Sequence, residues 1–508
     1  MTYNSLEITW KTAVPVESFE AHAVICLVSE AEWITGHFPE LWKQAITSVK
    51  ERGLFNGSEN QLFTIPVKQG NAAATLVLVG TGEHPMSVDE LRNLAAKAAK
   101  ASLQVSADEV VFAMPSSLVS YSDTLDISRV AHALTEGFIL GAYRKKNYKQ
   151  KQKAYTGPGK LIFHQEKITD PDFQKEWEKG IMLGQAFAAG TIYARDLTNL
   201  PGNMLVPEDL AKAAEHLAEE HGLEYSILDE KELENKGMGG ILSVGKGSIH
   251  PPRMIVIKYQ GKENWDGDIV GLVGKGITFD TGGISLKPRV GMEEMISDMG
   301  GAATVLGALQ TLCILRPKQN VLIVIPTAEN MPSGGAFKPG DVITTLSGRT
   351  VEILNTDAEG RVVLADGMTY AKDLGATRLI DVATLTGAVL SALGDVATGA
   401  VSNDETFLNR FISASRRTGE KVWPLPAYPE FQDMLRSDVA DLRNSTGRNA
   451  ASSTAGLFIG TFADGMPWIH LDIAGTAYLT KERGINPKGA TGVMVRTIVE
   501  WITSEEHE

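Results

Sequence analysis

Apolar and polar positions along the first 170 residues switch repeatedly between two periods. Short apolar runs predict buried strands at residues 22–29, 75–82, 109–115 and 160–165. Residues 88–103 and 127–143 instead carry apolar side chains at helical spacing. Strands that alternate with helices are typical of an α/β fold. We therefore expect an N-terminal α/β domain at residues 1–170, and we find no cluster of carboxylates in it.

A longer helical pattern separates this part from the rest of the chain. Residues 171–195 keep helical spacing and lead into a turn-forming sequence at residues 199–203. We interpret residues 171–197 as a connecting helix and residues 198–508 as a second, larger α/β domain. Within that domain the pattern predicts a helix at 207–221 and strands at 224–228, 253–259 and 269–273.

Length and charge narrow the possible functions. A chain of 508 residues is too long for one ordinary core, which agrees with two domains. Its hydrophobic content of 43% and charged content of 22% are those of a soluble globular protein. The net charge of −14 disfavours nucleic-acid binding, because phosphate contacts need a basic face. The basic run at residues 144–153 is the feature that invites such binding, and we interpret it as a solvated connection.

The cysteines and the N-terminus indicate the compartment. Cys26 and Cys313 both lie in apolar runs, where a thiol behaves as a small hydrophobe, so we expect no disulfide and no cysteine-based metal site. The first residues lack the basic segment and apolar core of a signal peptide. The most apolar stretch, residues 382–393, is shorter than the ~20 residues of a membrane-spanning helix. We therefore expect a cytoplasmic protein without a membrane segment.

A short polar turn lies between a predicted strand at residues 351–354 and a predicted helix at residues 362–372. Its sequence, NTDAEGR, brings two carboxylates and a guanidinium to the carboxyl end of a strand, where α/β folds place their ligands. Thr356 and Glu359 also have the spacing of a capping box. Helix capping alone could therefore account for the polarity of this turn.

A glycine-rich loop follows the predicted strand at residues 269–273. This loop, residues 274–288, carries Lys275, Asp280 and Lys287. On its own it could be a tight turn with solvated lysines, because glycines let backbones approach each other for many reasons.

Four carboxylates in or beside these loops suggest a common site: Asp280, Asp298, Asp357 and Glu359. Asp298, taken alone, could cap a helix predicted at residues 302–315. A parallel sheet could bring all four to one crevice, where so many anions would need cations, and two divalent ions would balance them. None of the histidines lies in these loops, so the ligands are rich in oxygen and Lys275 is the candidate nitrogen donor.

Lys275 would then be a metal ligand, whereas Lys287 and Arg361 would act as cations. A lysine ligates a metal only as a neutral amine, so the pKa of Lys275 must fall from ~10.4, which metal charge and burial can both achieve. Lys287 and Arg361 would remain as cations, positioned to stabilise negative charge that develops on a substrate.

The segments that carry these residues resemble those of the leucyl aminopeptidase, or cytosol aminopeptidase, family of dinuclear metallopeptidases. The matching blocks are GKGITFDTGGISLKP, MISDMGGAA, NTDAEGRVVLAD, DVATLTGA and HLDIAGTA. They occur in order between about Asn199 and the C-terminus, whereas the N-terminal domain is similar to the family's accessory domain only in size and pattern. The resemblance implies a smaller N-terminal α/β domain and a larger C-terminal catalytic α/β domain with a mixed, mainly parallel central sheet flanked by helices.

The resemblance also implies a role for each site residue. One metal ion would be held by Lys275, Asp280, Asp298 and Glu359, and the other by Asp280, Asp357 and Glu359. Lys287 would polarise the substrate carbonyl and stabilise the tetrahedral intermediate, while Arg361 would anchor a bicarbonate that acts as general base toward a metal-bridging water. The pocket for the first substrate side chain would be lined by Met295, Thr384 and Gly387. Met295 could instead belong to ordinary core packing.

The family further implies two zinc or manganese ions per subunit, with magnesium or cobalt as other options, and a homohexamer of two stacked trimers. The predicted function is the metal-dependent release of N-terminal amino acids, with leucine and other apolar residues preferred, from peptides with a free N-terminus. One alternative is another two-metal hydrolase such as a phosphoesterase, which gives no role to an amine ligand at Lys275. The other is a DNA-binding role, which would rest on residues 144–153 and which the acidity of the chain disfavours.

Overall fold

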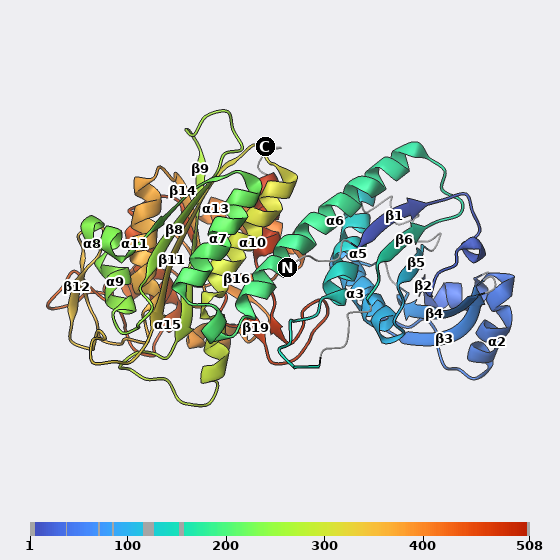
Figure 1. Cartoon of the computed structure of the whole chain (residues 1–508), viewed down its shortest axis with the longest axis horizontal. Helices are drawn as coiled ribbons and strands as arrows, with labels where there is room; N and C mark the ends of the chain where they lie inside the picture. Colours follow the sequence, from blue (N-terminus) through green and yellow to red (C-terminus); the bar gives the residue numbers. More distant parts are fainter. Residues whose placement is uncertain are drawn as a thin grey trace. The chain divides into compact units, whose positions relative to one another are not determined.

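The computed structural model describes residues 6–36, 38–69, 72–83, 86–114, 126–151 and 157–504. The chain forms two compact units (Figure 1). The first comprises Met1–Ala188 and Glu482–Pro487, and the second comprises Ala189–Lys481 and Lys488–Glu508. Helix α6 (Pro171–Thr198), which matches the long predicted helix, contributes residues to both units.

The first unit is built on a six-stranded sheet in which every pairing is parallel except that of β3 with β4. Its strand order is β1 (Glu7–Lys11), β6 (Lys160–His164), β5 (Glu109–Ala113), β2 (Ala23–Val28), β4 (Ala72–Gly80) and β3 (Leu62–Gln69). The four strands predicted from apolar runs are confirmed. The sequence analysis missed β1, whose five residues EITWK have only one buried side chain.

Helices cover both faces of this sheet because successive side chains of a strand point in opposite directions. In β2, Ile25 packs into a core with α3 (Val88–Gln104) and α5 (Ile127–Ala142), the two helices predicted from the pattern. The adjacent Val24 packs into a second core with α1 (Glu30–Thr35) and α2 (Lys43–Glu51). The basic run that begins at Arg144 is exposed as far as residue 151, and its last two residues lie outside the described part.

The second unit contains a nine-stranded sheet. Its order is β16 (Val422–Pro424), β15 (Thr398–Ser402), β18 (Trp468–Asp472), β14 (Arg378–Ala383), β9 (Ile269–Gly274), β11 (Asn320–Asn330), β8 (Arg253–Tyr259) and β7 (Glu224–Leu228), with β10 (Gly276–Asp280) beside β11. The central strands β18, β14, β9 and β11 are parallel, whereas β15, β8 and β7 pair antiparallel with their inner neighbours. This confirms the expected mixed, mainly parallel central sheet.

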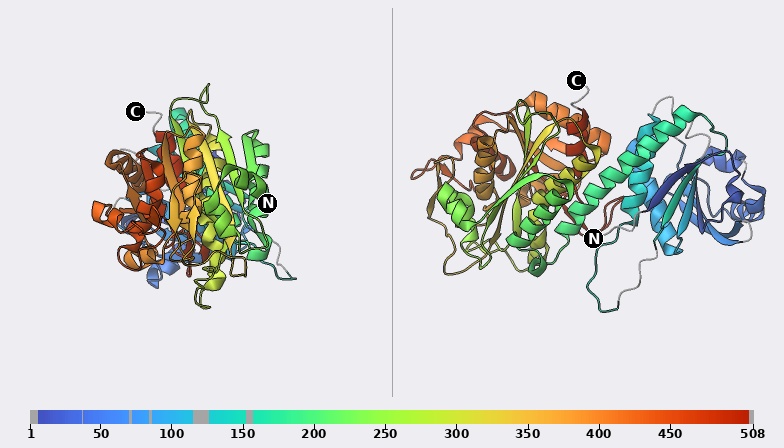
Figure 2. Two further views of the ribbon diagram at one scale, coloured as in Figure 1. Left: turned by 90° about the vertical axis from the view of Figure 1, so that its left-hand side faces the viewer. Right: turned by 45° about the horizontal axis from the view of Figure 1, so that its top comes forward.

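Helices α10 (Gly300–Leu315) and α11 (Gly360–Asp373) lie on opposite faces of this sheet (Figure 2). The last two residues of β9 point to opposite faces of the sheet, one toward each helix. Val273 meets α11, where a Cβ atom on Gly367 would lie 3.1 Å from Val273 Cγ1. Gly274 points the other way, and a Cβ atom there would lie 2.8 Å from Ala302 Cα in α10. A larger residue than glycine at position 274 would therefore push α10 away from the sheet.

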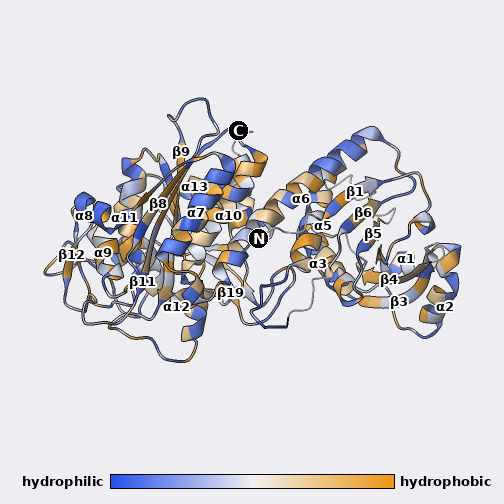
Figure 3. Ribbon diagram, viewed as in Figure 1, coloured by the Kyte–Doolittle hydropathy of each residue, from blue (hydrophilic) through white to orange (hydrophobic). Residues whose placement is uncertain are grey.

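The other helices of the second unit complete the two outer layers. They are α7 (Pro207–His221), α8 (Glu230–Lys236), α9 (Gly239–Gly245), α12 (Gly387–Leu393), α13 (Glu405–Thr418), α14 (Pro429–Asp433), α15 (Ala451–Gly460) and α16 (Val495–Ser504). Hydrophobic residues concentrate along strands β8 and β9 of the sheet (Figure 3). The continuous helical segment Met292–Leu315 is long and apolar enough to cross a membrane by length and composition, but 83% of its most apolar window is buried inside the fold.

The polar turn NTDAEGR does not follow a strand of the central sheet, contrary to what the sequence suggested. The strand before it is β13 (Thr350–Glu352), which pairs with β12 (Val342–Thr344) and β17 (Leu442–Arg443) in a separate three-stranded sheet. Two further short strands, β19 (Tyr478–Leu479) and β20 (Gly489–Ala490), form a hairpin-like pair. The polar turn therefore follows the three-stranded sheet β12–β13–β17, and it reaches the carboxyl ends of the central strands without belonging to their sheet.

Candidate metal centre

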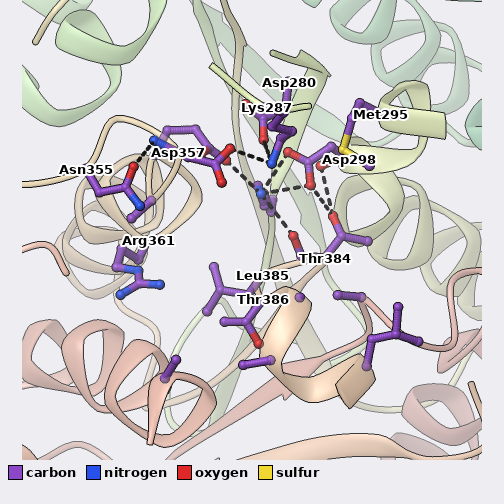
Figure 4. Close-up of a pocket in the computed structure, with 18 of the residues that line it drawn as sticks. Asp280, Lys287, Met295, Asp298, Asn355, Asp357, Arg361, Thr384, Leu385 and Thr386 are labelled. Carbon is purple, nitrogen blue, oxygen red and sulfur yellow. Dashed lines mark hydrogen bonds and ion pairs between the residues drawn. The ribbon is translucent and has the colours of Figure 1, made fainter. Parts of the chain in front are cut away.

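All the site residues selected from the sequence line one cavity of about 360 Å³ in the second unit (Figure 4). Lys275 follows β9, Asp280 ends β10, and Asp298 lies in the 3-10 helix η5 (Met292–Met299) just before α10. Asp357 and Glu359 come from the turn before α11. Carboxylate oxygens of Asp280, Asp357 and Glu359 lie within 4.8 Å of one another. Loops from several elements therefore converge on one acidic cluster.

Lys275 is buried between two of these carboxylates. Its Nζ lies 2.8 Å from Asp298 Oδ2 and 2.9 Å from Glu359 Oε1, and it donates to the Thr384 carbonyl at 3.0 Å. Burial alone would lower the pKa of Lys275, but the charges of Asp298 and Glu359 outweigh burial and raise it. The carboxylates by themselves thus keep an ammonium here. Ligation as a neutral amine requires the charge of a metal ion to displace the proton.

Lys287 contacts the remaining two carboxylates. Its Nζ lies 2.8 Å from Asp280 Oδ2 and 2.5 Å from Asp357 Oδ1. These neighbours raise the pKa of Lys287 against the opposing effect of burial. The side chain is 23% exposed, compared with 3% for Lys275, so Lys287 is the lysine that a molecule entering the cavity can reach.

The charges of this cluster do not balance. Four carboxylates contact two ammonium groups, which leaves an excess of two negative charges among these groups. Burial and the nearby Glu359 raise the pKa of Asp280 to about 6, and burial raises the pKa of Asp298 well above its usual range. Glu359 Oε2 is buried without a hydrogen-bond partner among the described residues. Surplus negative charge and an unpartnered carboxylate oxygen fit divalent cations, which prefer such hard oxygen ligands.

Two capping explanations that the sequence left open are wrong. Thr356 Oγ1 donates to the Gly282 carbonyl at 2.6 Å and accepts from Ser285 N at 2.8 Å, and α11 begins at Gly360 without a side-chain cap. Asp298 likewise does not cap α10, whose N-cap residue is Met299. Thr356 therefore ties the polar turn to the glycine-rich loop, while Asp298 is free to face Lys275.

The glycine-rich loop brings its backbone close to the carboxylates. Gly282 has a φ of 85°, and a Cβ atom there would lie 2.5 Å from the Ser285 carbonyl and 2.8 Å from Asp357 Oδ1. Its N–H also donates to Asp280 Oδ1 at 2.8 Å. Only glycine satisfies both the left-handed backbone and the close approach.

Arg361 lies in the first turn of α11, on the opposite side of the cavity from Met295 (Figure 4). Its Nη1 donates to the Asn444 carbonyl at 2.8 Å, while its buried Nε has no hydrogen-bond partner among the described residues. Burial lowers the pKa of Arg361 to about 10, against the effect of Glu359. The guanidinium remains a cation near neutral pH, with an N–H group left to bind an anion.

Sequence reasoning missed two buried residues that hold the site in place. Asn330, at the end of β11, donates to Asp280 Oδ1 and to the Thr356 carbonyl. Asp472, at the end of β18, accepts from Leu385 N at 3.1 Å and from Thr386 Oγ1 at 2.7 Å. It thereby fixes the loop that contains Thr384 and Gly387 in the cavity wall. The signal that could have revealed both is a polar residue at the carboxyl end of an otherwise apolar strand.

Comparison with known proteins agrees with this geometry. Residues 192–499 match the model of the cytosol aminopeptidase family, catalytic domain, and residues 27–152 match that of the family's N-terminal domain. The chain belongs to the cytosol aminopeptidase family. A probable cytosol aminopeptidase of Bacillus subtilis is 46% identical over 480 residues, which cover 94% of this chain and 93% of the relative. One from Alkaliphilus metalliredigens is 44% identical over 455 residues, 89% of each chain.

Solved structures of related proteins have the same fold. A mutant of tomato leucine aminopeptidase superposes with a TM-score of 0.86 at 28% identity, covering 98% of this chain and 97% of the other. The bottromycin maturation enzyme BotP in complex with Mn gives a TM-score of 0.82 at 34% identity, with 96% and 99% covered. This member of the cytosol aminopeptidase family is therefore a metal-dependent aminopeptidase that acts on peptides. The matches give no support to a phosphoesterase or a DNA-binding protein.

Proposed function

We propose that this aminopeptidase holds two divalent ions through the five residues selected from the sequence. Lys275, Asp280, Asp298 and Glu359 would bind one ion, and Asp280, Asp357 and Glu359 the other. The observation that carries this assignment is the surplus of negative charge, with three of the carboxylates sharing a space 4.8 Å across. Zinc or manganese suits the mixed set of oxygen ligands and one amine, and magnesium or cobalt would also be accepted.

The two ions, when bound, supply an acidified water and polarisation of the substrate carbonyl. The chain itself supplies a further cation near the reacting atoms, the ammonium group of Lys287. Lys287 reaches the cavity, so as an ammonium it can donate to the carbonyl oxygen of the scissile bond as negative charge develops there. An ammonium stabilises this charge more in the transition state than in the bound substrate, because the substrate carbonyl has not yet developed it.

Arg361 would bind a bicarbonate that acts as the general base. Its guanidinium is buried, keeps its charge near neutral pH and has an Nε–H group without a partner among the described residues. A planar anion can accept from such a guanidinium, and the Asn444 carbonyl holds the side chain in position. No side chain of the chain needs to act as the base in this arrangement.

Leucine and other apolar residues would be preferred at the N-terminus of the substrate. Met295, Thr384 and Gly387 line the cavity, and Ala474 and Ala477 add small apolar side chains to it. Such a wall favours an apolar first side chain and leaves a charged one without partners. The free α-amine of the substrate, as a neutral amine, would be a ligand for one of the two ions, which an N-acetylated substrate cannot provide.

We further propose that the enzyme is cytoplasmic and assembles as a homohexamer. The names of its relatives, cytosol aminopeptidases, support the location. Gel filtration with light scattering would test the assembly, and a monomer or dimer as the active species would contradict it.

The activity itself is tested with amino-acid p-nitroanilides. Purified protein should hydrolyse leucine p-nitroanilide, lose this activity after removal of metal by a chelator, and regain it with Mn²⁺ or Zn²⁺. The N-acetylated substrate is the matched control, because it has the same leaving group and side chain but no free amine. Equal cleavage of the acetylated and free substrates would contradict an exopeptidase.

A further inference from the structure

The side chain of Asn330 joins two loops of the metal centre. Asn330 is the last residue of β11 and is 1% exposed. Its Nδ2 donates to Asp280 Oδ1 at 2.8 Å and to the Thr356 carbonyl at 3.0 Å. The backbone carbonyl of Asn330 accepts from Thr281 N at 3.0 Å and from Thr281 Oγ1 at 2.7 Å. One residue therefore fixes the glycine-rich loop and the polar turn relative to the central sheet.

The orientation of this amide is determined by its surroundings. Both partners of Nδ2 are acceptors, so a flipped amide would place oxygen against oxygen. Asn330 Oδ1 has no hydrogen-bond partner among the described residues, and it lies 2.7 Å from the position that a Cβ atom on Gly283 would take. Glycine at position 283 leaves room for this oxygen. The burial of an unpartnered amide oxygen shows that the two donated bonds decide the conformation.

These bonds also orient Asp280. Its Oδ1 receives hydrogen bonds from Gly282 N and Asn330 Nδ2, both at 2.8 Å. Its Oδ2 is the oxygen that contacts Lys287 Nζ inside the cluster. Two donors on one oxygen restrain the rotation of the carboxylate and direct the other oxygen into the site. Because the amide is neutral, it does so without changing the charge of the centre.

We propose that Asn330 is a positioning residue of the metal centre, which selects Oδ2 of Asp280 as the ligand oxygen and sets its distance from Asp357 and Glu359. This inference rests on the proposed ligand set. Partners that orient metal ligands typically contribute about 10–100-fold to metal affinity. Asn330 should therefore contribute to metal binding itself, beyond its contribution to stability.

Asn320 provides a matched control on the same strand. It is the first residue of β11, is fully buried, and donates from Nδ2 to the Asn264 carbonyl at 2.7 Å, while its Oδ1 accepts from Lys262 N at 3.1 Å. It lies at the end of β11 opposite to the metal centre. Asn320→Ala and Asn330→Ala each remove a buried amide with two hydrogen-bond partners, so general loss of stability should affect both variants similarly.

The measurement is the Mn²⁺ affinity of protein stripped of metal, by competition with a fluorescent chelator, together with thermal unfolding without metal. Asn330→Ala should lose about 10–100-fold in affinity for at least one ion, whereas Asn320→Ala should bind as the unaltered enzyme does. Asn330→Ser, which keeps a shorter donor, should lose less and serves if Asn330→Ala does not fold. Equal affinities for the Asn330 and Asn320 variants would overturn the proposal.

Asp280→Asn, measured in parallel, separates this inference from the ligand assignment. If Asp280→Asn binds Mn²⁺ weakly and the Asn330 variants bind normally, only the positioning role fails. If Asp280→Asn retains full affinity, the ligand assignment itself is wrong and the positioning role falls with it.

Discussion

Each unit of the chain buries a cluster of charged side chains, and the two clusters differ in balance. In the first unit, Arg92 on α3 meets Glu136 on α5, with Nε and Oε2 2.7 Å apart and side-chain exposures of 3% and 0%. Between these closely packed helices one buried cation faces one buried anion, while the second carboxylate that Arg92 meets, Asp89, is 47% exposed. The Glu136 carboxylate also lies 3.4 Å from His132 Nε2. In the second unit, two lysines face four carboxylates at the ends of strands and loops. Balanced buried charges suit a structural contact, whereas a buried excess of one sign favours the binding of a counter-ion.

The largest effect should come from changing the lysine at the centre of the unbalanced cluster. Lys275→Arg keeps the positive charge, but a guanidinium does not lose its proton and cannot ligate a metal. We expect the variant to lose one tightly held ion, and activity should fall with it. The loss of metal affinity should exceed the roughly 10–100-fold that is typical when a residue hydrogen-bonded to a metal ligand is changed. Elemental analysis after gel filtration measures this. A fully loaded Lys275→Arg enzyme would show that Lys275 is only a loop cation.

The balanced cluster should respond in stability instead. Arg92→Met leaves the Glu136 carboxylate buried without its guanidinium, which typically costs about 3–5 kcal/mol. Metal content and kcat of the folded fraction should not change. Asp89, which meets Arg92 Nη1 at 3.1 Å but is 47% exposed, is the control. Asp89→Asn should cost less than about 1 kcal/mol. Denaturant unfolding compares the two variants, and loss of metal from Arg92→Met would break the distinction between the clusters.

Within the unbalanced cluster, the more exposed lysine should act in catalysis. Lys287→Ala should lower kcat by roughly 10²–10³-fold, or about 3–4 kcal/mol, by analogy with the loss of an oxyanion donor. Both ions should remain, because removing a cation leaves every proposed ligand in place. Rates and metal content measured on one preparation test this. Unchanged kcat, or loss of metal, would contradict the assigned role.

Arg361 should show its role through the response to bicarbonate. If Arg361 holds this anion, added bicarbonate should raise the rate of the unaltered enzyme, and the response should vanish in Arg361→Ala while both ions remain. If Arg361 only supports the turn through the Asn444 carbonyl, the variant should be less stable with an unchanged bicarbonate response. Rates across a bicarbonate series, together with thermal unfolding, separate the two outcomes.

The smallest effect concerns Asp366, a buried carboxylate that accepts hydrogen bonds from backbone N–H groups. It accepts from Leu346 N at 2.8 Å and from Ile241 N at 2.9 Å, and burial raises its pKa to about 7. The folded protein therefore binds more protons than the unfolded chain between about pH 4 and 7, and stability from this group should fall as pH rises through that window. Asp366→Asn should flatten that part of the curve of thermal midpoint against pH. An unchanged slope would show that Asp366 is ionised in the fold.

Local patterns explain why much of the fold could be predicted from the sequence. Strand β9 has no polar side chain and β8 contains four consecutive apolar residues, 254–257, while α7 has both helical spacing and a proline at its start. The three-residue strand β13 has no comparable pattern, so its assignment to a separate sheet was not visible. In β1, alternation over five residues is too short to distinguish a strand from a loop.

The side chains of the site were likewise predictable only where a local sequence pattern pointed to them. Acidic residues among glycines revealed the carboxylates, because burying so much charge demands a partner. Thr356 was ambiguous because its spacing from Glu359 is a local pattern, whereas its partner Gly282 lies 74 residues away. The place of Asn330 at the end of an apolar strand was a usable signal, but its partners were not, because its amide donates to acceptors 50 and 26 residues away. Which groups such a residue contacts depends on the folded chain.

The central claim is that the excess charge of this cluster holds two divalent ions, and the number of ions bound per chain tests it most directly. Protein stripped with a chelator should take up two Mn²⁺ ions per chain in a calorimetric titration. Glu359→Gln, which removes a carboxylate shared by both proposed sites, should weaken both binding events. Uptake of fewer than two ions by the unaltered chain, or two unchanged binding events in Glu359→Gln, would contradict the account.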